Sequence, residues 1–277
     1  MLRPLSILLS IASFSHAIQA EDKQSTNISI RLISSQFAPL QSNQDKPQGY
    51  VVDLFKTLRP KLKSKHNIIL GPIEFYPWRR AMQIASHEKN ALFFSLSRTN
   101  KRERKFKWLA EVSPYQQSIF SLSSDNGPQT NLIDDWQALI KSNKVLAVQS
   151  GSQLEGYVAN ELVMSNSQLS PVPHYLLAIN MLFAGRIDYL PLTSFLAKGT
   201  LCKGGYPSDR LELNFDINEF ASPLWAAFNP KTDDQLVEIV QREILEISES
   251  SWYQNHQIKV IEEWNKSECE NLALKSH

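Results

Sequence analysis

Hydroxyl, amide and basic side chains gather in one polar segment, residues 97–107, where a site for an anion could form. The loop Ser97-Arg98-Thr99-Asn100 comes first, and a basic run over 101–107 follows it. A carboxylate taken out of water needs hydrogen-bond donors. The planar guanidinium of an arginine can give it two parallel hydrogen bonds, which lysine cannot. Most basic runs are solvated surface, however, and the spacing alone favours that interpretation.

A second group of donors lies at Gly151 and Ser152, just before a segment of helical character at 153–163. Backbone amides at a helix N-terminus, together with a serine hydroxyl, can bind an anion or another ligand oxygen. The alternative is an ordinary N-cap serine, which satisfies the first amides of the helix itself. The two roles are compatible, and the sequence leaves both open.

The sequence offers little for catalysis or for a metal. His174 and Glu155 are the only acid–base candidates near these donors, and a general acid or base needs to be positioned on the reacting group. The segment Gly151-Ser152-Gln153 lacks the flanking glycines of a hydrolase nucleophile elbow. None of the six histidines stands at metal-ligand spacing from Cys202, Cys269 or another histidine. We therefore expect a protein that is not an enzyme, with no metal and no cofactor.

Short strand-like runs alternate with helical ones, which is typical of an α/β protein with mainly parallel sheets. Strands are expected at 29–34, 68–75, 91–96, 145–148, 189–192 and 224–228. Helices are expected at 52–62, 78–87, 153–163, 175–184, 232–248 and 251–265. Both donor segments then follow a strand directly. Phe37 follows the first strand and Trp78 opens a helix, so the two aromatics are expected on the same side of the sheet.

The first twenty residues have the order of a secretory signal peptide, with Arg3, an apolar run over 5–14 and small residues before a cleavage site at Ala17 or Ala20. Removing Arg3, the only charged residue among them, leaves 28 basic and 28 acidic side chains. A neutral chain has no general attraction for nucleic acid, which is therefore not an expected partner. Export would allow a disulfide between Cys202 and Cys269, and the sequence leaves this pairing open.

Several segments, in this order, resemble the family-3 bacterial solute-binding proteins, the polar amino-acid binding type. The first two are Gly49-Tyr50-Val51-Val52-Asp53-Leu54 and Pro77-Trp78-Arg79-Arg80-Ala81. The third runs from Ser95-Leu96-Ser97-Arg98-Thr99-Asn100-Lys101-Arg102 to Trp108 and Ser113-Pro114-Tyr115. The last two are Gln149-Ser150-Gly151-Ser152-Gln153 and Gly185-Arg186-Ile187-Asp188. Each motif alone has low specificity, and their order over residues 28–264 carries the resemblance.

The resemblance implies an α/β fold with two lobes, the type II periplasmic-binding-protein-like fold, joined by two hinge crossings. Lobe 1 would comprise residues 21–124 and 222–277, and lobe 2 would comprise residues 125–221. Polar composition at 123–131 and the segment 217–223 support limits in these places. A ligand would bind between the lobes, which close on it by hinge motion.

The resemblance and the residue types together give seven candidate ligand-binding residues: Arg102, Ser97, Thr99, Phe37, Trp78, Gly151 and Ser152. The resemblance implies that Arg102 binds the ligand carboxylate, while the basic residues at 104, 105 and 107 remain surface. The two aromatics would form the cleft wall, where an aromatic face packs on an apolar ligand part or on a cation. Core packing is the alternative for each of them.

One position departs from the family pattern. Amino-acid binding members carry an acidic residue a few positions beyond the Gly-x-x-Asp turn, and it pairs with the ligand's α-ammonium. This position falls at or near Thr193, and threonine cannot neutralise a buried ammonium. Either the ligand is not a standard α-amino acid, or Glu155 substitutes for the missing acid. Asp188 itself is expected to tie the turn.

These inferences together predict a monomeric periplasmic protein that captures a small polar ligand bearing a carboxylate, an amino acid or a related compound. It would deliver the ligand to the permease of an ABC-type transporter or to a receptor. Two alternatives remain open. One is an exported enzyme on the same scaffold, similar to a dehydratase of prephenate-like acids, and the other is a stand-alone sensory or accessory lobe.

Overall fold

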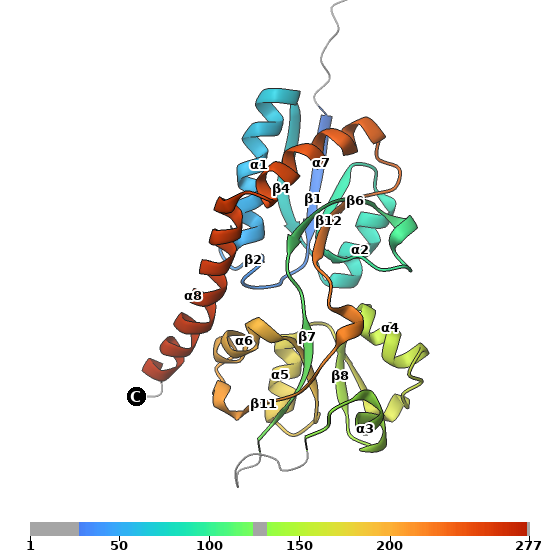
Figure 1. Ribbon diagram of the computed structural model, residues 1–277, viewed down its shortest axis with the longest axis vertical. Helices are drawn as coiled ribbons and strands as arrows, with labels where there is room; N and C mark the ends of the chain where they lie inside the picture. Colours follow the sequence, from blue (N-terminus) through green and yellow to red (C-terminus); the bar gives the residue numbers. More distant parts are fainter. Residues whose placement is uncertain (1–27, 124–131, 276–277) are drawn as a thin grey trace, which may run out of the picture.

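The computed structural model describes residues 28–123 and 132–275 (Figure 1). The predicted signal peptide with both cleavage sites, and residues 124–131 of the predicted boundary segment, lie outside these ranges. Two bodies lie one above the other, and a long C-terminal helix runs along one side of both (Figure 1). None of the helices within the described ranges is long and apolar enough to cross a membrane.

The body that we call lobe 1 is built on a five-stranded sheet of order β4-β1-β5-β12-β6. These strands are β1 (Ile28–Ser34), β4 (Ile68–Phe75), β5 (Ala91–Ser97), β6 (Lys107–Ser113) and β12 (Leu224–Phe228). β1 runs parallel to β4 and β5, whereas β12 runs antiparallel to β5 and β6. A two-stranded ribbon, β2 (Ser42–Asn43) and β3 (Pro47–Gln48), precedes the first helix.

Helices cover both faces of this sheet, which explains why the central strand β5 is almost entirely buried. Helices α1 (Tyr50–His66) and α7 (Asp234–Ser248) pack with Leu32 and Phe94 in one core on one face. Helix α2 (Trp78–His87) packs with Ile33 and Phe93 on the other face. Neighbouring residues of a strand point to opposite faces, so strands such as β1 and β5 contribute to both cores.

The body that we call lobe 2 contains a three-stranded antiparallel sheet of order β10-β7-β11 and a parallel pair, β8 with β9. These strands are β7 (Gln117–Leu122), β8 (Leu146–Gln149), β9 (Leu169–Val172), β10 (Leu190–Thr193) and β11 (Leu211–Asp216). Its helices are α3 (Trp136–Lys141), α4 (Gln153–Asn160), α5 (Tyr175–Phe183) and α6 (Ala197–Lys203). The carboxylate of Asp188 accepts the amide N–H of Val145 at 2.8 Å, so it ties the turn before β10.

Short 3-10 helices complete the connections. They are η1 (Glu103–Lys105), η2 (Asn166–Gln168), η3 (Ser194–Leu196), η4 (Ser208–Arg210) and η5 (Asn218–Phe220). The last helix, α8 (Ser251–Lys275), extends ten residues beyond the predicted end at 265.

The chain passes between the two sheets twice, from β6 to β7 through residues 114–116 and from β11 to β12 through residues 217–223. The predicted lobe limits of 21–124 with 222–277, and of 125–221, stay a prediction. By sheet membership β7 belongs with β10 and β11.

The direction of the strands differs from the sequence prediction, and the pairing of the two cysteines, which the sequence left open, is now defined. The expectation of mainly parallel sheets is wrong, because β12 returns from lobe 2 and enters the first sheet antiparallel to both neighbours, while all strand pairs around β7 are antiparallel. The open question about the cysteines is answered by a disulfide between Cys202 and Cys269, with an S–S distance of 2.07 Å.

Candidate functional site

The candidate site lies where the carboxyl ends of strands from both lobes meet. Phe37 follows β1, Ser97 ends β5, the loop 150–152 follows β8, and Thr193 ends β10. Ligands of open α/β sheets bind outside the carboxyl ends of the strands. The topology therefore brings both predicted donor segments to the side of the sheets where the lobes face each other.

Arg102 lies just after the end of β5, in a turn that holds it close to its own loop. Its backbone N–H donates to the carbonyl of Thr99 at 2.8 Å, and its Nη1 donates to the carbonyl of Ser97 at 3.2 Å. Within β5, Ser95 adopts a positive φ of 62°, opposite an irregularity in the β5–β12 register. Such bulges re-aim the end of a strand. Ser97 and Thr99 thus contribute their carbonyls to the position of Arg102.

The guanidinium of Arg102 is half-buried and lacks the acidic partner that its neighbours have. Arg98 pairs with Glu103 at 2.6 Å, and Lys101 pairs with Glu161 at 2.8 Å. Among residues 28–123 and 132–275, no carboxylate forms an ion pair with Arg102. Burial lowers the pKa of Arg102 to about 10, and the nearby hydroxyl of Tyr115 raises it only in part. Arg102 therefore remains charged at neutral pH while much of its hydration is lost.

Trp78 connects Arg102 to the opposite lobe. Its ring centroid lies 5.7 Å from Cζ of Arg102, within the range of a cation–π contact. Its indole Nε1 donates to the carbonyl of Gly151 in lobe 2 at 3.1 Å. The ring also packs on Phe93 of lobe 1, with centroids 5.4 Å apart. Trp78 thus lies at the lobe interface and also packs on lobe 1, as the core-packing alternative supposed. Its contact with a ligand stays a prediction.

The backbone of Gly151 has a φ of +78°, which favours glycine. A β-carbon there would lie 3.6–3.7 Å from atoms of Arg79 and Trp78, an ordinary van der Waals contact, so the backbone conformation and not lack of space favours glycine. Ser152 is the N-cap of α4, because its Oγ accepts the N–H of Glu155 at 3.1 Å. The carboxylate of Glu155 in turn accepts the N–H of Gly151 at 2.6 Å. The capping role of Ser152 is thus present, and Glu155 holds the loop.

Tyrosines at the interface were not singled out as ligand-binding residues from the sequence. Tyr115 lies in the first crossing, and its ring meets Phe37 edge-on at 6.2 Å between centroids. Tyr175 opens α5, and its hydroxyl accepts a hydrogen bond from Nε2 of Gln117 at 3.3 Å. The sequence predicted a helix from Tyr175 but not the strand β9 before it, so it gave no signal that placed Tyr175 at the interface. Tyr115 belongs to a matched segment, but nothing local to it predicts its burial.

The two tyrosine hydroxyls are neutral at physiological pH. Burial raises the pKa of Tyr115 well above its usual value, and the proximity of Tyr175 raises it further. Burial also raises the pKa of Tyr175 to about 12, although hydrogen bonds from Gln117 and the Gln149 backbone lower it in part. A neutral hydroxyl can donate a hydrogen bond to an anion, whereas a phenolate would repel it. The Arg102 guanidinium therefore lies near neutral hydroxyl donors at the interface.

Phe37 and Thr193 lie at the edges of this arrangement. Phe37 packs against the core of lobe 1, and its ring also contacts Tyr115 in the first crossing. Thr193 is buried at the end of β10 and pairs in register with Gln117. No acidic side chain stands at that position.

The acid–base candidate His174 has a capping role in the structure. His174 is exposed, and its Nδ1 accepts the N–H of Leu177 at 3.2 Å as the N-cap of α5. In the parts of the chain that the structure describes, no three His, Cys, Asp or Glu residues gather in a way that could hold a metal ion.

Comparison with known proteins gives matches among solved structures only. Neither a protein-family model nor a curated protein sequence matches this chain. A histidine kinase sensor domain with similarity to periplasmic binding proteins superposes with a TM-score of 0.69 at 14% identity, covering 83% of this chain and 95% of that one. An ancestral arginine-binding protein bound to glutamine gives 0.66 at 18% identity, with 85% and 97% covered.

A third similar structure is an amino acid ABC transporter substrate-binding protein from Streptococcus pneumoniae bound to L-arginine. Its TM-score is 0.66 at 21% identity, with 84% of this chain and 94% of that one covered. These similarities show that the chain has the two-lobed fold of periplasmic binding proteins, as the sequence predicted. At such identities they show the fold alone.

Proposed function

We propose that this chain is an exported solute-binding protein that closes its two lobes around a small ligand bearing a carboxylate, and that Arg102 binds this carboxylate. The observation that carries the proposal is a half-buried guanidinium at the interface with no acidic partner among the described residues. Burying an unpaired charge is costly. A ligand carboxylate would supply the missing counter-charge, and the neutral hydroxyls of Tyr115 and Tyr175 would add donors.

The lobes in this proposal move about the crossings at 114–116 and 217–223. Trp78 and Gly151 already meet across the interface, as do Lys101 and Glu161. A ligand that contacts both lobes binds the closed state more tightly than the open one and therefore shifts the population toward closure. Gly151 and the loop before α4 would provide the lobe 2 side of the site.

We further propose that the ligand lacks a charged α-amine, or keeps that amine in water. By the resemblance, the acidic residue that would pair with an ammonium falls at or near the neutral Thr193, and the carboxylate of Glu155 already accepts the Gly151 amide N–H. An ammonium buried without a partner costs several kcal/mol. That cost would cancel much of the roughly 8 kcal/mol of a micromolar complex.

The proposed location is the periplasm, and the proposed partner is a transporter permease or a receptor. The disulfide between Cys202 and Cys269 supports an oxidising compartment. The similarity to substrate-binding proteins of amino acid ABC transporters supports a transporter partner, and the similarity to a sensor domain supports a receptor. The protein would act as a monomer without a cofactor, and binding without catalysis is the proposed activity.

A thermal-shift screen with matched pairs tests this proposal. Each pair contains an amino acid, such as L-glutamine or L-arginine, and its deaminated analogue. A ligand at a hundredfold its Kd adds about 2.7 kcal/mol to the free energy of unfolding. We expect shifts from carboxylates without the amine, and loss of those shifts in Arg102→Ala. Shifts from the amino acids alone would leave the carboxylate site in place but overturn the ligand class. An equal shift in Arg102→Ala would overturn the site.

A further inference from the structure

Helix α8 is attached to lobe 1 by its first half. The buried hydroxyl of Tyr253 donates to the carbonyl of Val112 in β6 at 2.6 Å. Nε2 of His256 lies 3.0 Å from a carboxylate oxygen of Asp53 in α1. The helix then continues downward past the crossings and alongside α6 of lobe 2 (Figure 1). At 1.5 Å per residue its 25 residues extend about 37 Å, enough to reach along both lobes.

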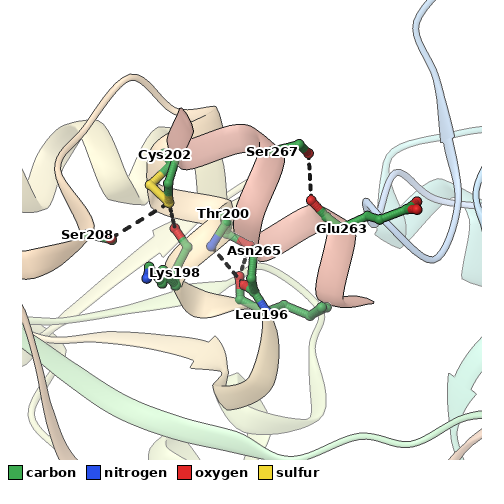
Figure 2. The surroundings of a disulfide bond; sticks show 10 residues. Leu196, Lys198, Thr200, Cys202, Ser208, Glu263, Asn265 and Ser267 are labelled. Atoms are coloured by element: carbon green, nitrogen blue, oxygen red, sulfur yellow. Dashed lines mark hydrogen bonds between the residues drawn. A yellow bond between two sulfur atoms is a disulfide. The ribbon is translucent and has the colours of Figure 1, made fainter. Parts of the chain in front are cut away.

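The second half of α8 is attached to lobe 2 by close packing, by hydrogen bonds and by a covalent bond. Any β-carbon at Gly199 in α6 would come within 2.5 Å of the Trp264 ring, so the two helices are in direct contact. Asn265 accepts the N–H of Gly199 at 3.0 Å and donates to the carbonyl of Phe195 at 2.8 Å. One turn further on, the disulfide joins Cys269 to Cys202 at the end of α6 (Figure 2).

We propose that α8, closed by the Cys202–Cys269 disulfide, is a third connection between the lobes and limits how far they open. The two crossings are short, three residues at 114–116 and seven at 217–223, and the second includes the 3-10 helix η5. By contrast, α8 is a continuous helix with anchors on both lobes. Opening the interface at Trp78 and Gly151 requires α8 either to bend or to separate from one lobe. The disulfide prevents its second half from separating from α6, so the connection favours the closed arrangement.

The position of α8 determines the direction of this restraint. In Figure 1, α8 lies on one side of the molecule, and α2 and α4 lie on the other. The Trp78–Gly151 contact joins the first residue of α2 to the loop before α4. A connection on one side acts as a pivot, so opening is confined to the side of α2 and α4. This restraint on the lobes follows from the fold alone. Its consequence, tighter binding of a ligand by the closed state, rests on the proposed function.

The test measures the separation of the lobes directly, without ligand. Dyes are attached through unnatural amino acids at the exposed positions Lys63 in α1 and Lys141 in α3, away from α8. Single-molecule energy transfer then reports the closed fraction. The proteins compared are the oxidised wild type, the wild type after reduction with tris(2-carboxyethyl)phosphine, and Cys202→Ser/Cys269→Ser. We expect a smaller closed fraction in the second and third samples, and no effect of the reductant on the double variant.

Two single variants keep the test independent of whether the cysteine variant folds. Asn265→Ala removes both hydrogen bonds to lobe 2 with the disulfide intact, and should lower the closed fraction to a lesser extent. Ser267→Ala is its matched control, because the Ser267 hydroxyl bonds only the Glu263 carbonyl within α8 among the contacts in Figure 2. An unchanged closed fraction after reduction of the folded wild type would overturn the proposal.

Amide exchange locates the change. Reduction should accelerate exchange in the second half of α8 and in α6, about tenfold for each 1.4 kcal/mol of local stability lost, and leave α1 unchanged. Because no ligand is added, the restraint and the proposed function are tested separately. A smaller closed fraction together with a negative ligand screen would support the third connection and count against the proposed function.

Discussion

Trp78→Phe isolates the hydrogen bond that joins the lobes beside the candidate site. The substitution keeps an aromatic ring on Phe93 and near Arg102 but removes the indole donor to the Gly151 carbonyl, a contact of 3.1 Å. A neutral hydrogen bond contributes about 0.5–1.5 kcal/mol net. Its loss should therefore lower the ratio of closed to open molecules by roughly twofold to tenfold.

The same energy-transfer pair measures this ratio, and calorimetry measures the binding affinity. If the ligand binds the closed state, the apparent Kd should rise by up to the same factor. The matched control is Trp108→Phe, which removes an indole hydrogen bond of 3.2 Å to the Glu103 carbonyl within lobe 1. The reasoning would be refuted by an unchanged closed fraction in Trp78→Phe, or by an equal change in both variants.

Further predictions concern the scaffold of lobe 1. The buried carboxylate of Glu243 accepts hydrogen bonds from Lys65 and His66, both at 3.0 Å, and these contacts lower its pKa. Because the folded-state pKa is lowered, this stabilisation is present above the ordinary pKa of about 4.3 and is lost as the pH falls through the folded-state value. In urea unfolding, Glu243→Gln should then lower the free energy of unfolding by about 1.5–3 kcal/mol at pH 7, and the difference from the wild type should shrink below about pH 4. The control Glu246→Gln, at an exposed position of the same helix, should change the free energy of unfolding little. Equal losses in the two variants would contradict the role assigned to Glu243. Gly49→Ala should lower the free energy of unfolding, measured in urea, more than Gly185→Ala does. Both glycines have a positive φ, but only at Gly49 would a β-carbon lie 2.3 Å from a backbone oxygen. An equal loss of stability in the two variants would contradict this prediction.

The sequence predicted those elements whose periodicity is set locally. The strands at 68–75 and 224–228 and the helix at 78–87 are found with the expected limits. α1 ends at His66, with Asn67 as its C-cap in the left-handed conformation at a φ of 55°, whereas the sequence pattern placed the end at residue 62, four residues earlier. Helix limits depend on capping and packing as well as on hydrophobic spacing.

The features that the sequence did not predict are those that depend on tertiary structure. β6 and β7 are separated by only three residues, so the sequence does not mark the change of sheet between them. The extension of α8 beyond 265 is stabilised by its contacts with α6. The pairing of Cys202 with Cys269 spans 67 positions, a separation that no local pattern reveals.

The candidate site was predictable in part. The polar segments at 97–102 and 150–152 both follow strands of parallel pairs, and Trp78 contacts Arg102 of the first and Gly151 of the second. That the two segments bind a ligand stays a prediction. The burial of Tyr115 and Tyr175 was not predictable, since a single aromatic residue gives no sign of which surfaces will cover it. The lack of a partner for Arg102 is likewise a property of the fold.

Calorimetry on Arg102→Ala and Arg104→Ala tests the central claim most directly, with the best carboxylate from the thermal-shift screen as the ligand. Removing the partner of a buried carboxylate should cost about 3–5 kcal/mol, which is more than a hundredfold in Kd. Arg104 is exposed in the same basic run, and its loss should cost about 0–1 kcal/mol. The account predicts severely weakened binding in Arg102→Ala with the fold retained, and near wild-type binding in Arg104→Ala. Equal effects of the two substitutions would show that the run acts as a general basic surface, and would contradict the account.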